Sequence, residues 1–136
     1  MDPVELRPVG RVSSELTDPH AAPKQPDEGA PGAWLVLDDG FAPAAADLRP
    51  GDRVIVLTWL DRADREALQV HPRDDASNPL TGVFGTRSQD RPNPIGLHET
   101  EIAEVDGTRI RVTALEAVDG TPVLDVKPVI GSVETR

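Results

Sequence analysis

The segment from residue 82 to residue 97 carries the side chains best suited to hold a small anionic ligand. It places Pro92 and Pro94 two positions apart, and proline has no backbone N–H to contribute to a strand ladder. Arg87 and Arg91 precede them, and the planar guanidinium of arginine donates two parallel hydrogen bonds to a carboxylate. The segment therefore predicts either a carboxylate-binding corner or a tight structural corner with solvated arginines.

Other familiar chemistries are absent from the sequence. There is no cysteine, which excludes disulfides, a thiol nucleophile and thiolate zinc sites. His20, His71 and His98 are far apart and lack metal-ligand spacing, so we predict no metal site and place these histidines at the surface or the rim of the core. A glycine-rich phosphate loop and a GxSxG nucleophile elbow are also missing, which argues against a doubly wound nucleotide-binding fold.

The strands that must position this segment are short. Asp106-Gly107 joins two of them, since this dipeptide tolerates positive φ at both central positions of a hairpin turn. Beyond it, Ile110 alternates with Arg109 and Arg111, which is typical of a strand with one buried and one solvated face. Many short strands with frequent turns predict an all-β fold, an antiparallel barrel or sandwich. The predicted strands are Val9–Val12, Trp34–Leu37, Val54–Leu60, Val83–Thr86, Leu97–Val105, Arg109–Leu115 and Val123–Val126.

Helix is a minor element in this sequence. The 14 prolines and 11 glycines interrupt the apolar runs, so no amphipathic helix of three turns can be found. Short helical turns are predicted at Ala42–Leu48 and Arg62–Leu68. The proline-rich segment Thr17–Gly32 holds little that could enter a core and is predicted to be a long loop, a kind of element that often carries function. A chain of 136 residues is expected to form a single domain over residues 1–136.

Two stretches of the sequence match a known family signature. Residues 82–97 read GVFGTRSQDRPNPIGL and look like the family pattern GVFATRSPxRPNPIGLS. Residues 118–128 read VDGTPVLDVKP and resemble the pattern LDGTPVLDIKPY. Weaker similarities lie at Pro8–Val12, Pro23–Pro26 and His71–Arg73. Over nearly its whole length, the chain resembles a short single-domain form of the TrmO/TsaA-like family of S-adenosylmethionine-dependent tRNA methyltransferases.

This resemblance implies a small antiparallel β-barrel that binds S-adenosyl-L-methionine, usually as a homodimer. It also implies N-methylation of the threonylcarbamoyladenosine beside the tRNA anticodon. The absence of cysteine fits the cytoplasmic location that we expect. Two alternatives stay open. One is a methyltransferase that acts on a small-molecule amine or amide, and the other is a non-catalytic regulator that retains only the cofactor pocket. Turnover to S-adenosylhomocysteine distinguishes an enzyme from such a regulator.

The resemblance also carries functional positions onto this sequence. Asp61 and Asp119 are the carboxylates nearest the motifs and are predicted catalytic groups, because an amide-type acceptor nitrogen must lose a proton. The predicted cofactor contacts are Gln25, Pro26, Leu60, Asp61, Arg87, Leu97, Leu115, Glu116, Val118 and Asp119. The predicted substrate contacts, which include the cations that a tRNA backbone requires, are Arg65, Arg73, Arg91, Asn93 and Lys127.

Several of these roles have an ordinary structural alternative. Arg87 is predicted to clamp the carboxylate of the cofactor, whereas Gln25 either bonds a polar end of the cofactor or is a solvated loop residue. Leu97 either packs against the sugar or base of the cofactor or belongs to the core. Asp61 is either a proton acceptor or the salt-bridge partner of a neighbouring arginine. Asp119, followed by glycine, is equally consistent with a plain hairpin turn.

The sequence departs from the family in ways that bear on the methyl acceptor. The pattern WFHRADR reads WLDRADR over residues 59–65, so Asp61 stands where the family has a histidine. TRSP has become TRSQ, KPY has become KPV, and the chain contains no tyrosine. A net charge of −10 repels phosphate backbones, and aromatic platforms for RNA bases are scarce. These features question tRNA as the acceptor more than they question the cofactor.

The sequence shows no sign of a membrane segment. No apolar run approaches the roughly 20 residues of a membrane span, and the N-terminal residues carry acids where a signal peptide has an apolar core. We therefore expect a soluble, unprocessed protein without a membrane partner.

Overall fold

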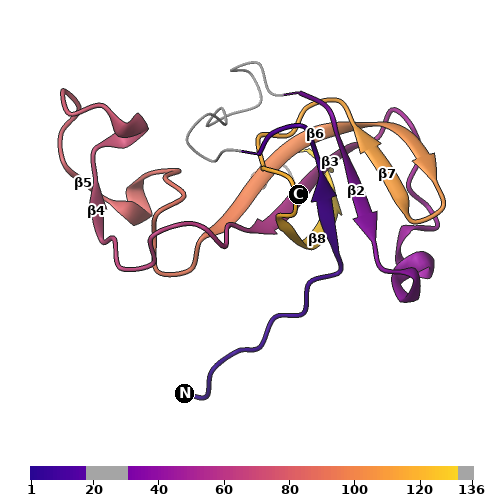
Figure 1. Ribbon diagram of the computed structural model, residues 1–136, viewed down its shortest axis with the longest axis horizontal. Helices are drawn as coiled ribbons and strands as arrows, with labels where there is room; N and C mark the ends of the chain where they lie inside the picture. Colours follow the sequence, from indigo (N-terminus) through magenta and orange to yellow (C-terminus); the bar gives the residue numbers. More distant parts are fainter. Residues whose placement is uncertain (18–30, 132–136) are drawn as a thin grey trace.

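Six strands close into an antiparallel β-barrel, which confirms the all-β prediction (Figure 1). The computed structural model describes residues 1–17 and 31–131. Around the barrel the strands follow the order β1-β2-β7-β6-β3-β8. Their bounds are Gly10–Ser13 (β1), Ala33–Leu37 (β2), Arg53–Trp59 (β3), Ile95–Asp106 (β6), Arg109–Val112 (β7) and Pro122–Pro128 (β8). Gln69–Val70 (β4) and Thr81–Gly82 (β5) form a separate two-stranded ribbon.

The alternation of side chains along the strands builds the core. On β3, Val54, Val56 and Thr58 are buried, while the residues between them are partly exposed. Leu35 of β2 and Ile110 of β7 belong to the same cluster of buried side chains as the two valines. Because successive side chains of a strand point to opposite faces, closing the ring buries one face of each strand.

Strand β6 joins the two sides of the barrel. It is 12 residues long and pairs with β3 through its first half and with β7 through its second half. Leu97 lies opposite Leu57 of β3. The pairing with β7 shifts between Ile102 and Glu104, and a bulge of this kind bends a strand and increases its twist. The bend helps so long a strand curve around a small barrel.

The hairpin between β6 and β7 lies one residue further along than the sequence predicted. Asp106 pairs with Arg109, so the central turn residues are Gly107 and Thr108. Of these two turn residues, only Gly107 has positive φ, at 61°. The aspartate therefore closes the strand pair instead of entering the turn, and glycine supplies the left-handed conformation that other residues rarely adopt.

The described helices are short 3-10 turns, and none is long and apolar enough to cross a membrane. The turn η2 (Asp39–Ala45) begins before the predicted Ala42–Leu48 and overlaps it. The predicted strand Val83–Thr86 is wrong, because Val83–Gly85 forms the 3-10 turn η4, closed by a bond from the Thr86 N–H to the Val83 carbonyl.

The helical turn predicted at Arg62–Leu68 is also wrong. This segment is a series of tight turns, in which the Asp64 carboxylate accepts a hydrogen bond from the Glu66 N–H at 2.9 Å. An aspartate side chain that bonds the backbone two residues ahead competes with helix formation. The proline-rich loop predicted at Thr17–Gly32 lies almost wholly outside the described residues.

Residues 60–94 form a lobe that leaves the barrel after β3 and returns at β6 (Figure 1). It contains the β4–β5 ribbon, η4 and a further 3-10 turn, η3 (Pro72–Asp74). The outgoing and returning chains are tied together where they meet the barrel. The Leu60 N–H donates to the Pro94 carbonyl at 2.8 Å, and Arg65 Nε donates to the Pro92 carbonyl at 2.8 Å. These bonds hold the arginine-bearing segment against the end of the barrel.

Candidate functional site

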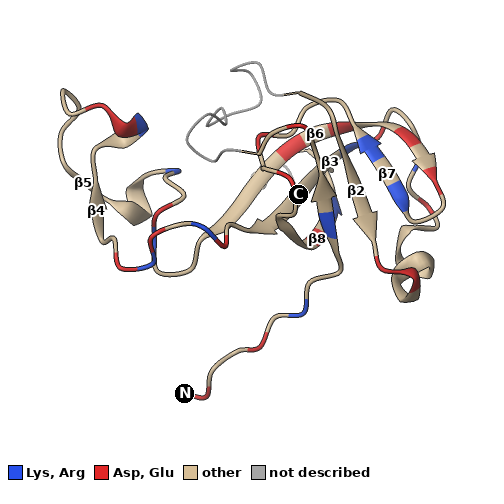
Figure 2. Cartoon of the chain, in the orientation of Figure 1, with Lys and Arg blue, Asp and Glu red and all other residues tan. Residues whose placement is uncertain are grey.

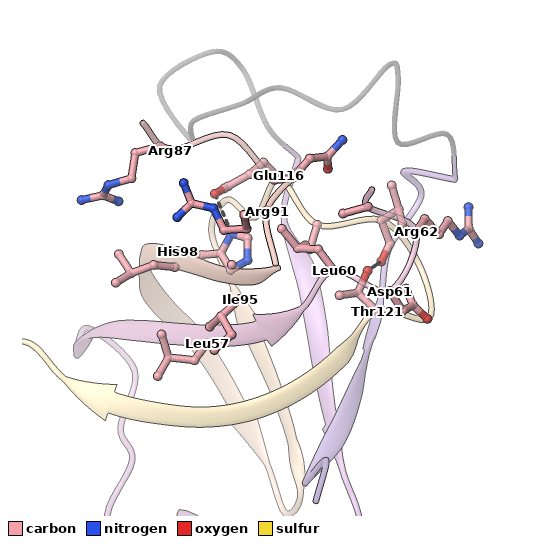
Figure 3. Close-up of a pocket in the computed structure, with 16 residues that line it drawn as sticks. Leu57, Leu60, Asp61, Arg62, Arg87, Arg91, Ile95, His98, Glu116 and Thr121 are labelled. Carbon is pink, nitrogen blue, oxygen red and sulfur yellow. Dashed lines mark hydrogen bonds and ion pairs between the residues drawn. The ribbon is translucent and has the colours of Figure 1, made fainter. Parts of the chain in front are cut away.

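A cavity of about 360 Å³ lies at the end of the barrel where β3 stops and β6 starts (Figure 3). This volume falls within the roughly 300–1,000 Å³ of typical small-ligand sites. Its wall combines charged and apolar side chains. The charged residues of the lining are Arg62, Arg87, Arg91, Asp61 and Glu116, and the large apolar residues are Leu57, Leu60, Ile95, Leu97 and Val118.

A buried series of hydrogen bonds begins at two residues of the cavity wall, Glu116 and His98. His98 Nδ1 lies 2.5 Å from Glu116 Oε1, and His98 Nε2 lies 2.7 Å from the hydroxyl oxygen of Thr58. The side chains of His98 and Glu116 are only 4% and 9% exposed. A carboxylate can only accept, so Nδ1 donates to Glu116, while Nε2 forms the hydrogen bond with the Thr58 hydroxyl. Both ring nitrogens of His98 and the hydroxyl of Thr58 therefore have a hydrogen-bond partner.

Gly96 makes room for this chain of bonds. It lies opposite Thr58 in the β3–β6 pairing, and its face of the strand points into the barrel like that of His98. A Cβ at this position would approach Thr58 Oγ1 to 2.4 Å and His98 Nε2 to 2.6 Å. The glycine is therefore needed for close approach of two side chains and not for a turn.

Arg91 connects the cavity to the lobe. Its Nη2 donates to the Val83 carbonyl at 2.5 Å and to the Thr86 carbonyl at 2.6 Å, which anchors the end of η4. Hydrogen bonds from a guanidinium are stronger than those between neutral groups. Arg91 is thus fixed in place, with its guanidinium facing the cavity beside Glu116 (Figure 3).

Two buried polar atoms in this wall have no partner among the described residues. They are Nε of Arg91 and Oε2 of Glu116. An unpaired buried polar group costs roughly 1–3 kcal/mol, and more when it is charged. A donor and an acceptor left free in the wall of one cavity are suited to a ligand that offers both an acceptor and a donor.

The structure brings most of the predicted cofactor contacts to this cavity. Leu97 is 48% exposed and lines it, so Leu97 does not belong to the core. Asp61 also lines it, and neither neighbouring arginine is paired with its carboxylate among the described side chains, since Arg62 donates to the Thr17 carbonyl and Arg65 to that of Pro92. The predicted residues that line the cavity are Leu60, Asp61, Arg87, Arg91, Leu97, Glu116 and Val118.

Asp119 and Leu115 lie away from the cavity lining. The Asp119 carboxylate accepts a hydrogen bond from the Ser14 N–H at 3.0 Å, and Gly120 follows with φ of 84°. This aspartate therefore ties a turn to the end of β1. Leu115 is fully buried in the barrel core. Gln25 and Pro26 lie outside the described residues.

The predicted substrate contacts are dispersed. Arg65 stacks on the Trp59 ring, 5.2 Å from its centroid, and its Nη2 donates to Asn93 Oδ1 at 3.2 Å. Lys127 of β8 pairs with Asp125 at 3.2 Å, and Arg73 belongs to η3 in the lobe. Of the five, only Arg91 lines the cavity.

Sequence reasoning missed Thr58, Gly96 and His98 as site residues. His98 was expected at the surface or the core rim, yet it is 3% exposed. The available signal was the alternation along β6, where Gly96, His98 and Thr100 occupy every second position. A histidine on the inward face of a strand needs hydrogen-bonding partners, and such a position marks a candidate polar site.

Among the described residues, the carboxyl group with a shifted pKa is Asp75, in the lobe. Hydrogen bonds from the hydroxyl and the N–H of Ser77 hold the pKa of Asp75 below its usual value. Because bonding to the ionised form favours that form, this carboxylate stabilises its turn. It has no part in the cavity.

Comparisons with known proteins agree with this architecture. Residues 11–135 match the family model of the tRNA-methyltransferase O N-terminal domain. A probable S-adenosyl-L-methionine-binding protein of Archaeoglobus fulgidus is 39% identical over 132 residues, which are 97% of this chain and 36% of that protein. A second protein of that organism, an S-adenosyl-L-methionine-binding protein, is 38% identical over 90% of this chain and 86% of its own length.

A solved structure gives the same result in three dimensions. The crystal structure of TrmO from Pseudomonas aeruginosa superimposes with a TM-score of 0.75 at 26% identity, covering 99% of this chain and 61% of that one. This chain thus spans about a third of the first Archaeoglobus relative and three fifths of TrmO. By its sequence match and its barrel, the chain belongs to the family of the tRNA-methyltransferase O N-terminal domain.

Proposed function

We propose that this chain binds S-adenosyl-L-methionine in the cavity at the end of the barrel and transfers its methyl group. The observation that carries this proposal is the meeting of both signature segments at one cavity, which contains Arg87, Arg91 and Leu97 from the first and Val118 from the second. The names of the two Archaeoglobus relatives support the cofactor. When bound, the cofactor supplies an electrophilic methyl group on a sulfonium.

The cavity wall suits the different parts of such a molecule. The arginines of the wall can bind a carboxylate of the ligand, and the acidic side chains can bind its cationic and N–H groups. Leu57, Leu60 and Leu97 offer apolar contact for a sugar or base. Methyl transfer is a direct displacement, so most of the rate enhancement can come from holding the acceptor in line at near-contact distance. The chain's own residues are therefore required mainly to bind and orient.

We propose modified tRNA as the acceptor, with methylation of threonylcarbamoyladenosine. The name of the matching family model and the fold shared with TrmO support this choice. The acceptor nitrogen must lose a proton. Asp61 is the better proton acceptor of the two predicted aspartates, because it lies exposed in the cavity wall while Asp119 is bound to Ser14.

A small-molecule amine or amide is the second candidate acceptor. The acidic side chains are spread over both the barrel and the lobe (Figure 2), and the net charge is −10. Several cations outside the cavity are already paired with acids, as Lys127 is with Asp125 and Arg111 with Glu104. Fewer free cations mean weaker attraction to a phosphate backbone.

The proposed function is tested in two steps. Calorimetry with S-adenosyl-L-methionine should show saturable binding, and cofactor at about 100 times its dissociation constant should stabilise the fold by about 2.7 kcal/mol. Mass spectrometry of nucleosides from tRNA incubated with protein and cofactor should then reveal a methylated threonylcarbamoyladenosine. Absence of binding at millimolar cofactor contradicts the first step. Binding without tRNA methylation contradicts the acceptor alone and directs the search to small amines and amides.

We further propose that the protein works as a homodimer. Ile95 and Leu97, which are 43% and 48% exposed, lie on the outer face of β6 at the rim of the cavity. Exposed apolar side chains beside an open cavity are suited to pack against a second copy of the chain. A dimer interface there would enclose the cavity and exclude water from it.

A further inference from the structure

The described part of the chain holds three stacks of an arginine on an aromatic ring. They are Arg7 on Phe41, Arg65 on Trp59 and Arg109 on Trp34. The Arg65–Trp59 stack adjoins the cavity, because Trp59 is the last residue of β3 and pairs with Ile95 of the cavity wall. A guanidinium that lies flat on a ring is held by cation–π attraction, and its opposite face is left for another planar group.

The guanidinium of Arg65 is fixed in one orientation. Its carbon lies 5.2 Å from the centroid of the Trp59 ring, its Nε donates to the Pro92 carbonyl at 2.8 Å, and its Nη2 donates to Asn93 Oδ1 at 3.2 Å. By contrast, the Arg109 side chain forms no hydrogen bond within the described ranges and lies opposite Asp106 in the β6–β7 pairing. A group held in place before a ligand arrives loses little side-chain entropy on binding.

The outer face of the Arg65 guanidinium is open to a ligand. Arg65 is exposed, whereas Trp59 beneath it is partly buried. No carboxylate pairs with Arg65 among the residues that the structure describes, and its Nη1 has no acceptor there. The stack therefore presents a flat, positively charged surface with unused hydrogen-bond donors along one edge.

We propose that the Arg65–Trp59 stack is the platform for one unpaired nucleobase of the RNA acceptor, adjacent to the nucleotide that is methylated. The base lies flat on the guanidinium, and Nη1 donates to a phosphate oxygen of the same strand. This inference rests on the proposed function, because it requires RNA as the methyl acceptor. It gives Arg65 a specific partner, a base, in addition to the general attraction of a cation to the RNA backbone.

The hydrogen bonds of Arg65 favour a stacked base over a phosphate or carboxylate alone. An anion of either kind prefers two parallel N–H groups of the guanidinium, but the edge formed by Nε and Nη2 is occupied by Pro92 and Asn93. The flat face stays accessible, and stacking on arginine planes and aromatic rings is how proteins commonly hold unpaired RNA bases. The positive charge also suits the phosphate that accompanies each base.

The position of the stack beside the cavity indicates which base it holds. The Asp61 N–H donates to the Trp59 carbonyl at 3.0 Å, and the Cα atoms of these residues are at most about 7.6 Å apart. Asp61 lies in the cavity wall and is the proposed proton acceptor. A base on Arg65 therefore belongs to a nucleotide that neighbours the one whose base enters the cavity.

The test is a double-mutant cycle between the protein and an RNA hairpin whose loop carries threonylcarbamoyladenosine. Two further hairpins each lack one base, on the 5′ or on the 3′ side of that nucleotide. For the wild-type protein, one of these abasic hairpins should bind about 10-fold more weakly than the intact hairpin, as expected for the loss of a stacked base. In Arg65→Lys, which keeps the charge but not the plane, the intact hairpin should bind about 10-fold more weakly and the abasic change should have less than about a threefold further effect.

Arg109→Lys is the matched control. It makes the same substitution in the Arg109–Trp34 stack on another part of the barrel wall, and it should respond to the abasic hairpins as the wild-type protein does. The affinity of Arg65→Lys for S-adenosylhomocysteine should stay within about threefold of the wild-type value, because Arg65 does not line the cavity. Thermal unfolding and light scattering of the same samples report whether the variant keeps its fold and its oligomeric state.

The possible results separate this inference from the proposed function. If Arg65→Lys weakens the intact and abasic hairpins equally, weakens neither, or only shifts the protein toward the monomer, Arg65 does not hold the base and the inference is wrong. Should that variant fail to fold, the wild-type protein decides, because tight binding of both abasic hairpins contradicts a stacked neighbour. If the wild-type protein methylates the intact hairpin but ignores both abasic changes, the platform alone is rejected. If it binds cofactor but no hairpin, the RNA acceptor is wrong and the platform is rejected with it.

Discussion

Glu116 Oε1 lies 2.5 Å from Nδ1 of His98, although 18 residues separate them in the sequence. The pair joins β6 to the segment that precedes β8 and continues through the ring to Thr58 of β3. One buried polar chain thus links three parts of the barrel at the cavity. Members of such networks depend on one another, so removing one affects the rest.

Gly96→Ala should destabilise the protein. The new Cβ would collide with Thr58 Oγ1 and His98 Nε2, which forces the two side chains apart and breaks a buried hydrogen bond at a cost of about 1–3 kcal/mol. Urea unfolding measures this loss. Gly82→Ala is the control, because nothing lies within 4 Å of its new Cβ, and it should change stability by less than about 0.5 kcal/mol. Equal stability of the two variants would refute the packing role of Gly96.

Thr58→Val should also destabilise the fold, by about 1–3 kcal/mol, because it leaves His98 Nε2 buried without a partner. Val and Thr have similar shapes, so the loss reports the hydroxyl and not a cavity. Chemical denaturation is again the measurement. The control Thr113→Val changes an exposed threonine and should be nearly neutral. A neutral Thr58→Val would mean that the bond makes no net contribution.

Arg91→Lys should loosen η4. Both carbonyls, of Val83 and Thr86, accept from the one nitrogen Nη2, and the shorter lysine side chain does not bring its ammonium to that position. We expect the Thr86 amide, which closes η4 by bonding to Val83, to exchange its hydrogen about 10-fold faster, as a loss of about 1.4 kcal/mol in local stability implies. Exchange measured by NMR should be unchanged in Arg53→Lys, whose side chain makes only exposed ion pairs. Unchanged exchange in Arg91→Lys would show that η4 does not need this clamp.

If tRNA is the acceptor, Arg73→Glu and Arg65→Glu should reduce tRNA methylation more than they reduce cofactor affinity. Methylation at subsaturating tRNA should also fall steeply between low and moderate salt, because phosphate contacts release counterions. Arg65 also holds the Pro92 carbonyl, so the stability of Arg65→Glu is measured beside its activity. Arg111→Glu makes the same change in net charge on β7 and serves as the control. If methylation changes neither with salt concentration nor with these charge-reversing substitutions, the small-molecule acceptor is favoured.

Light scattering at tens of micromolar should report about twice the chain mass of 14.6 kDa. Leu97→Glu should shift the protein toward the monomer, because a charge in a buried apolar interface is costly. Leu6→Glu changes a leucine of similar exposure, 49% against 48%, and should leave the mass unchanged. A wild-type mass near 14.6 kDa in the presence of cofactor rules out the dimer.

Local patterns in the sequence were enough to predict the all-β architecture. The alternation at Arg109, Ile110 and Arg111 appears directly as the exposed, buried and half-buried residues of β7, because a strand's side chains alternate whatever it packs against. The sequence pattern did not distinguish a strand from a 3-10 turn in a segment of only a few residues. Val83–Thr86 has strand-like composition, yet it forms η4, since hydrogen bonds from Arg91 to its carbonyls stabilise the turn.

The sequence by itself singled out two segments that meet at one cavity, since both signature segments contribute to its wall. Only the tertiary structure decided which side chains act together there. Whether His98 faces water or the interior depends on which face of β6 the closed barrel buries, and its contact with Glu116 depends on a segment 18 residues away. Asp119 follows Glu116 by three residues, yet its carboxylate accepts a hydrogen bond from the Ser14 N–H and lies outside the cavity wall. Such contacts arise from ring closure among distant strands, which no local pattern encodes.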